Sequence, residues 1–120
     1  MPLGCRQALV LINHTTIPFD PARRDEAMEL VTNLLEYSKA EDGTVRYRAM
    51  TDVENANVVR FFEQYEDVAA AEAHTESDQY RRFVKSLPDL VDGEIETVQF
   101  QTDDVECAEF TASEVVSTLD

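Results

Sequence analysis

The side chains best suited to chemistry gather between Phe61 and Pro88, in the segment FFEQYEDVAAAEAHTESDQYRRFVKSLP. His74 is the strongest candidate for acid-base work there, because imidazole is the side chain whose ordinary pKa lies nearest neutral pH. The alternative is a structural histidine that caps carbonyl groups at a helix end and packs against the next helix. The residue types leave both roles open.

Tyr65 inside this segment, and Asn13 and Tyr47 outside it, are further candidates for site residues. Asn13 lies in an apolar stretch, and a buried amide requires hydrogen-bond partners, so it is either a site residue or a satisfied part of the core. The hydroxyls of Tyr47 and Tyr65 could donate hydrogen bonds to a bound oxygen atom. Alternatively, both rings fill the core and leave their hydroxyls at its rim.

Glu63 stands between Phe61 and Tyr65 on one face of an expected strand. A carboxylate is costly to bury without a partner. We therefore expect an ion pair across a hairpin, with Arg46 or Arg48 as the partner of Glu63.

The chain offers little for a metal or a redox centre. Its histidines and carboxylates show no metal-ligand spacing, so we expect no structural metal. Cys5 and Cys107 lie near opposite ends without a CxxC spacing. Two reduced structural thiols are the expectation, and a disulfide that joins the two ends is the alternative.

The composition is strongly acidic, with a formal net charge of −15 from 25 acidic and 10 basic residues. Such a surface repels phosphate backbones and anionic lipid, which argues against nucleic acid and membranes as partners. Because the excess is spread along the chain and lysine is nearly absent, adaptation to concentrated salt is favoured over recognition of a basic partner. The N-terminus lacks a signal-peptide pattern and no apolar run could span a membrane, so we expect a soluble, cytoplasmic protein.

The hydrophobic pattern predicts three strands and a long helix in the first half. A buried strand is expected over Gln7–Thr16, and a helix follows from an Asp20 cap and Pro21 to about Lys39. Gly43 supplies the left-handed turn that ends this helix. Two further strands, Thr44–Thr51 and Val58–Tyr65, are joined by a short polar turn and therefore form a hairpin.

Two helices and a strand are expected in the second half. Asp67 opens a helix that runs through His74, and a capping box from Thr75 to Asp78 restarts a second one. Pro88 is expected to break that second helix. A fourth strand over Glu94–Gln101 follows, and Thr111 with Glu114 predicts a short C-terminal helix.

The order β-α-β-β-α-β predicts an α+β, ferredoxin-like split-βαβ sandwich with helices on one face of the sheet. We assign residues 1–102 to this single domain and residues 103–120 to an acidic tail. The strands carry apolar residues on both faces, so the uncovered face is expected to stack on a second copy in a homodimer, with His14 at the interface.

Four pieces of the sequence resemble the antibiotic-biosynthesis monooxygenase superfamily, whose members are small dimeric α+β barrels. The pieces are KAEDGTVRYRAM, DVENANVVRFFEQYED, AAAEAHTESDQYRRFV and EIETVQF, between about Ala8 and Gln101. Two departures stand out. Tyr65 replaces a usual tryptophan, and Val84 stands where haem-degrading members would place their haem-ligating histidine.

The resemblance implies a cofactor-independent monooxygenase that acts on a quinol or polycyclic aromatic with O₂. His74 would handle the proton, and Asn13 and Tyr65 would orient the substrate. The substrate-binding residues would be Tyr47, Phe61, Tyr80 and Phe83. The alternatives are a dimer that binds a small apolar ligand or serves a stress response without catalysis, and a haem-binding oxygenase.

Overall fold

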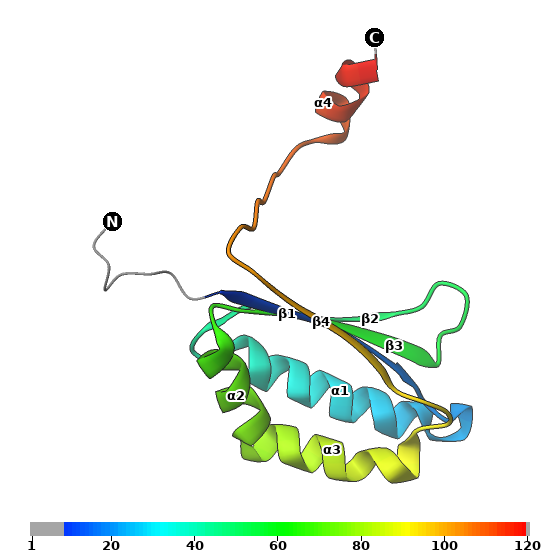
Figure 1. Cartoon of the computed structure of the whole chain (residues 1–120). Helices are drawn as coiled ribbons and strands as arrows, with labels where there is room; N and C mark the ends of the chain where they lie inside the picture. Colours follow the sequence, from blue (N-terminus) through cyan, green and yellow to red (C-terminus); the bar gives the residue numbers. More distant parts are fainter. Residues whose placement is uncertain (1–8, 120) are drawn as a thin grey trace.

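A four-stranded antiparallel sheet, covered on one face by helices, organises the computed structural model, which describes residues 9–119 (Figure 1). The strands are β1 (Val10–Pro18), β2 (Thr44–Thr51), β3 (Val58–Tyr65) and β4 (Glu96–Thr102), in the spatial order β2-β3-β1-β4. The helices are α1 (Arg24–Lys39), α2 (Val68–Glu76), α3 (Asp78–Leu90) and α4 (Ala112–Val116), with 3-10 turns at Pro21–Arg23 and Ser117–Leu119. This arrangement confirms the predicted ferredoxin-like fold.

Local sequence signals account for most of the element boundaries. Asp20 accepts a hydrogen bond from the Ala22 amide at the start of the first helical turn. Gly43 takes the left-handed conformation, with φ 83°, that the turn into β2 requires. β1 begins later and runs further than predicted, to Pro18, and residues 7 and 8 of that prediction lie outside the described residues.

Two predictions about α3 are wrong. Its cap is Ser77 rather than Thr75, because the Ser77 backbone is extended and its hydroxyl accepts from the Tyr80 amide. Pro88 does not end the helix, which continues to Leu90. A proline near a helix end removes only one backbone bond, and this last turn is held by the buried Leu90 and by the bond from Val91 N to Leu87 O (2.9 Å).

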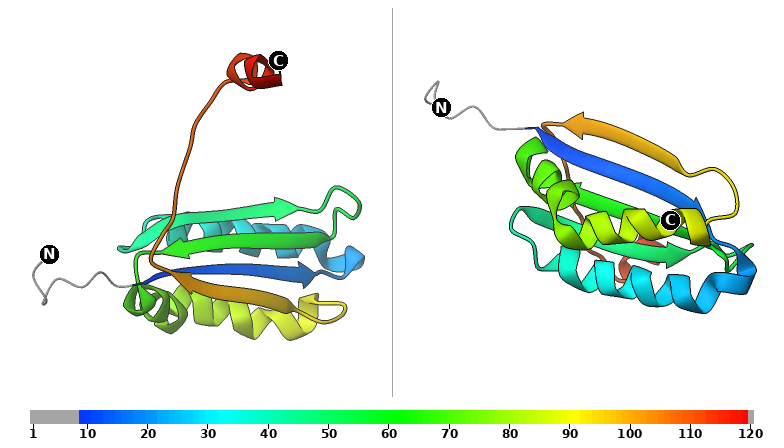
Figure 2. Two further views of the ribbon diagram at one scale, coloured as in Figure 1. Left: turned by 45° about the horizontal axis from the view of Figure 1, so that its top comes forward. Right: turned by 90° about the horizontal axis from the view of Figure 1, so that it is seen from below.

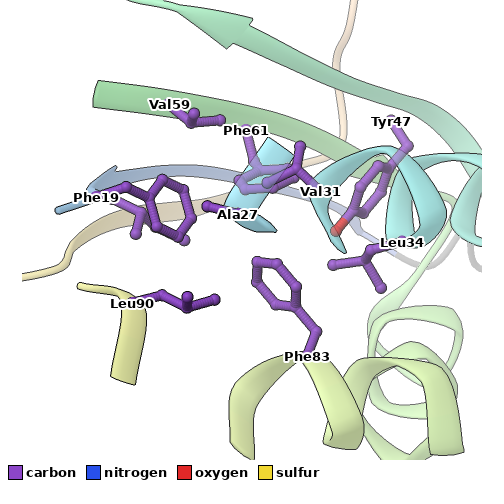
Figure 3. Close-up of a cluster of buried hydrophobic side chains, with 10 residues drawn as sticks. Phe19, Ala27, Val31, Leu34, Tyr47, Val59, Phe61, Phe83 and Leu90 are labelled. Carbon is purple, nitrogen blue, oxygen red and sulfur yellow. The ribbon is translucent and has the colours of Figure 1, made fainter. Parts of the chain in front are cut away.

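The covered face of the sheet packs on α1 and α3 around a core of aromatic and aliphatic side chains. Tyr47, Phe61 and Phe83 turn toward one another between the sheet and α3 (Figure 3). The buried members of the core are Ile17, Phe19, Ala27, Val31, Leu34, Tyr47, Val59, Phe61, Phe83 and Leu90. This core fixes the side of the sheet on which a site can be enclosed.

The opposite face of the sheet, called here the open face, carries no helix (Figure 2). Strand register places its side chains in three rows across the sheet. The rows are Arg46–Gln64–Ile12–Phe100, Arg48–Phe62–His14–Val98 and Met50–Arg60–Thr16–Glu96. His14 therefore lies on the face where a second copy is expected.

Residues 103–119, called here the C-terminal arm, leave the end of β4 and rise away from the open face (Figures 1 and 2). The arm ends in α4, whose first turn is capped by Thr111 through the Glu114 amide. Within residues 9–119, none of the helices is both long enough and apolar enough to span a membrane.

Candidate functional site

A cavity of about 200 Å³ lies between the covered face of the sheet and α3. Its wall combines aromatic, aliphatic and threonine side chains with one carboxylate: Thr15, Ile17, Leu34, Tyr47, Phe61, Glu63, Tyr80, Phe83, Val84, Leu87, Ile95 and Thr97. Two larger and more open depressions, of about 540 and 580 Å³, lie over β2 and beneath the C-terminal arm. We place the candidate site in the smaller cavity because the buried carboxylate Glu63 lines it and lines neither of the two larger depressions.

Glu63 is the carboxylate of this cavity, and the prediction that an arginine pairs with it is wrong. Its Oε1 accepts a hydrogen bond of 2.6 Å from the Tyr65 hydroxyl, while Arg46 lies on the open face and donates to Gln64. Strand alternation separates Glu63 from both arginines, because residues 46 and 48 of β2 point to the opposite face from residue 63 of β3.

Burial governs the proton affinity of Glu63. The side chain lies in the core with little contact with water, and this desolvation raises the pKa of Glu63 above its usual value of 4.5. The hydrogen bond from Tyr65 and the proximity of His74 oppose the shift without cancelling it. A carboxylate with a raised pKa is a stronger base than an exposed one.

His74 lies behind the cavity wall in a buried contact with Glu41. Its Nδ1 donates to Glu41 Oε1 at 2.6 Å, and its Nε2 lies 3.5 Å from the Tyr47 hydroxyl. The ring also packs edge-on against Tyr80, with centroids 4.9 Å apart. Because the Glu41 side chain remains 14% exposed, a chain of polar groups leads from solvent through His74 to the cavity wall.

The tyrosines around His74 are neutral hydrogen-bond donors. Burial, reinforced by the nearby Glu63 carboxylate, raises the pKa of Tyr47 and of Tyr65 well above the usual value of 10.0. The pKa of Tyr80 is raised for the same two reasons. Tyr47 and Tyr80 line the cavity and can therefore present an O–H group to a bound oxygen atom.

Asn13 faces the helices, one strand away from Glu63. It pairs in register with Glu63 on β3 and with Gln99 on β4. Its Oδ1 is buried and has no hydrogen-bond partner among the described residues. An unpaired buried carbonyl of this kind requires an explanation, and a ligand donor is one.

The predicted site residues thus separate into two groups. All four predicted substrate-binding residues, Tyr47, Phe61, Tyr80 and Phe83, line the cavity. The three predicted catalytic residues do not line it: His74 and Tyr65 are fully buried behind it, and Asn13 lies beside it in the sheet.

Neither of two acidic residues was assigned to the site from the sequence: Glu63 was expected to form an ion pair with an arginine, and Glu41 was not singled out. Glu63 carried a usable signal, since an acidic residue between Phe61 and Tyr65 on the buried face of a strand is unusual. Glu41 carried none, because it was interpreted as part of the turn that ends α1.

A ferredoxin-like sheet with an aromatic-lined cavity between its covered face and α3 defines the class of small α+β proteins to which this chain belongs. Residues 10–86 match the family model described as antibiotic biosynthesis monooxygenase, and the chain belongs to this family.

Individual relatives agree with this assignment. YcnE, a Bacillus subtilis protein whose name carries a proposed monooxygenase activity, is 24% identical over 90 residues, which are 75% of this chain and 95% of that protein. The structure of Rv0793 from Mycobacterium tuberculosis matches with a TM-score of 0.74 at 17% identity, and the match covers 83% of this chain and 99% of that one. PA3566 from Pseudomonas aeruginosa gives a TM-score of 0.73 at 23% identity, over 79% of this chain and 95% of that one. These structural matches show the fold.

Proposed function

We propose that the protein is a cofactor-independent monooxygenase that hydroxylates a small quinol with O₂. The observation that carries the proposal is Glu63, a buried carboxylate of raised pKa in the wall of an otherwise aromatic and aliphatic cavity. Membership of the antibiotic biosynthesis monooxygenase family supports the reaction class.

Proton removal is the step that the cavity would promote. Glu63 accepts the proton of a phenolic hydroxyl, and the hydroxyls of Tyr47 and Tyr80 donate to the oxygen on which negative charge develops. His74 and Glu41 hold the Tyr47 hydroxyl from behind and connect it to solvent for proton exchange. Asn13 and Tyr65 orient the ring and the Glu63 carboxylate.

The substrate would supply the electrons. The quinolate gives one electron to O₂, and the resulting radical pair combines to form a carbon–oxygen bond. Cleavage of the peroxide O–O bond leaves one oxygen atom on the ring and releases the other as water. A quinol and O₂ thus give a hydroxyquinone and H₂O, and the quinol is the reductant.

Cavity size favours a one- or two-ring quinol over a larger polycyclic substrate. The volume of about 200 Å³ lies below the roughly 300–1,000 Å³ of pockets that hold drug-sized ligands. Binding of haem is not favoured, because Val84 occupies the cavity wall where the resemblance would place a haem-ligating histidine. Valine offers no atom for iron.

The test is aerobic turnover of reduced menadione, followed by oxygen consumption and by the absorbance of the hydroxylated quinone. Glu63→Gln keeps the size and the hydrogen-bond acceptor but not the base, so we expect kcat to fall about 10²–10⁴-fold. Glu29→Gln, on the exposed side of α1, is the matched control and should turn over as the wild type does.

Rates equal to the protein-free reaction across a panel of quinols and anthrones would contradict the proposal. A thermal shift with those compounds but no oxygen consumption would instead indicate a ligand-binding protein without catalysis. Equal rates for Glu63→Gln and Glu29→Gln would remove Glu63 from the mechanism.

A further inference from the structure

The polar side chains in the wall of the candidate cavity form two separate groups. Glu63 and Tyr47 pair in register across β3 and β2, and Tyr80 on α3 lies close enough to Glu63 for the carboxylate charge to raise its pKa. These three residues, called here the inner group, carry the proposed proton transfer. The remaining polar residues of the wall are Thr15 and Thr97, called here the threonine pair. The proposed function gives this pair no role.

The threonine pair bridges β1 and β4 on the covered face of the sheet. Thr15 and Thr97 lie in register, and their hydroxyl oxygens are 3.0 Å apart. One hydroxyl donates to the other, so this bond uses one of the two hydrogens. Neither hydroxyl has another partner among the described residues. The pair therefore has a spare hydrogen and spare lone pairs at the cavity wall.

The threonine pair lies where the cavity meets solvent. β4 is an edge strand of the sheet and is largely exposed (Figure 2). Thr97 is exposed, and so are Val84 and Ile95 beside it in the cavity wall. Glu63, in contrast, is buried. A ligand that enters from this side can contact the inner group with one end and the threonine pair with the other.

Sheet geometry sets the distance between the two groups. Asn13 pairs with Glu63, and Thr15 lies two residues further along β1. Diagonal neighbours of this kind in an antiparallel pair are about 7–8 Å apart. Phe61, in register with Thr15, and Phe83 on α3 give the cavity aromatic walls beside both groups. One aromatic ring with an oxygen at each end matches this spacing and this wall.

We infer that the threonine pair is a second oxygen-binding subsite, which makes the cavity selective for rings with two oxygens on opposite sides, as in para-quinols. The inference rests on the proposed function, in which Glu63 takes the proton of the first hydroxyl. The spare hydrogen of the pair donates to the second oxygen, and the ring lies between the two groups. A compound with a single oxygen cannot make this second hydrogen bond.

Calorimetric titration under nitrogen tests the subsite without turnover. The two probes are naphthohydroquinone, which has two oxygens across one ring, and α-naphthol, which has one. We expect the wild type to bind naphthohydroquinone about 2–10-fold more tightly, the range for one hydrogen bond that replaces a bond to water. A variant with Thr15→Val and Thr97→Val keeps both shapes and removes both hydroxyls together, so it should fold. It should lose the preference and bind α-naphthol as the wild type does.

Two further variants separate ligand binding from a structural role of the pair. Thr15→Ser with Thr97→Ser keeps both hydroxyls and should keep the preference for naphthohydroquinone. Thr32→Val is the control, because Thr32 is exposed on α1 and its hydroxyl donates to the Met28 carbonyl. If the pair only tied β4 to β1, the valine variant would weaken both probes alike and leave the ratio of their affinities unchanged.

An equal ratio of the two affinities in the wild type and the valine variant would overturn the inference, as would a wild type that binds neither probe. Failure of the proposed function gives a different result. A wild type that prefers naphthohydroquinone under nitrogen but forms no hydroxyquinone in air would keep the subsite and lose the catalysis. Aerobic turnover with the same KM for naphthohydroquinone in the wild type and the valine variant would keep the catalysis and remove the subsite.

Discussion

At the scale of single residues, the site depends on where burial places a carboxylate. Glu63 and Tyr65 share the buried face of β3, and the short bond between them satisfies one carboxylate oxygen without neutralising its charge. An arginine partner would have lowered the pKa of Glu63, whereas a tyrosine partner leaves burial as the dominant influence. The cavity therefore contains a base rather than an ion pair.

This raised pKa predicts how stability depends on pH. The native state holds the Glu63 proton more tightly than the unfolded chain, so the contribution of Glu63 to the free energy of unfolding is fully present below pH 4.5 and is lost as pH rises through the native pKa. The slope from this one group reaches at most about 1.4 kcal/mol per pH unit. Urea unfolding of the wild type and Glu63→Gln between pH 4.5 and 8 measures it.

Glu63→Gln should lack this component, so the stability difference between the two proteins should change in favour of the variant as pH rises. Glu29→Gln should follow the wild type, because Glu29 is exposed on α1. Parallel curves for the wild type and Glu63→Gln would show that the carboxyl group titrates alike in both states.

At the scale of elements, the turn between α1 and β2 connects the fold to the site. Gly43 has φ 83°, and a Cβ there would lie 2.6 Å from the Cβ of Ala70 on α2. Its carbonyl accepts from the Glu66 amide at 2.8 Å, which ties the turn to the end of β3. The same turn carries Glu41 to His74. Close packing of this turn on α2 therefore sets the position of the buried Glu41–His74 contact.

Gly43→Ala should destabilise the protein by about 2–3 kcal/mol, from the left-handed backbone and from the clash with Ala70. Ala70→Gly alone should cost about 1 kcal/mol, because glycine weakens α2. Urea unfolding of the two single variants and the double variant completes a cycle.

The double variant should be less destabilised than the sum of the single ones by roughly 0.5–3 kcal/mol, since the clash requires both Cβ atoms. Strictly additive losses would mean that the turn moves away from α2 without penalty.

Most elements were predictable because their signals are local. Asp20, Asp67 and Gly43 mark their boundaries through backbone bonds or φ values that depend on a few neighbouring residues. The last turn of α3 was not predictable in this way, because contacts with distant segments stabilise it: Asp20 N bonds to Leu90 O at 2.8 Å. Tertiary contacts there override the local effect of Pro88.

The site was predictable in its residue types but not in its arrangement. Strand alternation placed Tyr47, Phe61, Glu63 and Asn13 on the helical side of the sheet. It could not show that Tyr65, rather than an arginine, would bond Glu63. Nor could it show that Glu41 would reach His74, which is 33 residues away in the chain.

At the scale of the whole molecule, charge dominates. The chain has 25 acidic and only 10 basic residues, so its acidic side chains repel one another. Cys107 is a free, exposed thiol, and Cys5 lies outside the described residues. Repulsion of this kind opposes the compact state and weakens as salt shortens the screening length from about 30 Å at 0.01 M to about 3 Å at 1 M. Adaptation to concentrated salt therefore stays a prediction, namely that the folded state becomes more stable as salt screens this repulsion.

The free energy of unfolding should rise as KCl increases from millimolar to molar concentration, as measured by urea titration at each salt concentration. A variant with Glu29→Gln, Glu36→Gln and Glu72→Gln removes three exposed charges from the helices and should show a smaller dependence on salt. A stability that does not change with KCl, or an equal slope for both proteins, would count against salt adaptation.

The distribution of the tyrosines gives the molecule an intrinsic optical reporter. The chain has four tyrosines and no tryptophan, so its ultraviolet emission comes from tyrosine alone. Tyr47, Tyr65 and Tyr80 surround His74, and two of them line the cavity. With Tyr37→Phe, all remaining emission would originate beside the site, and its quenching would follow the arrival of a quinol without any attached dye.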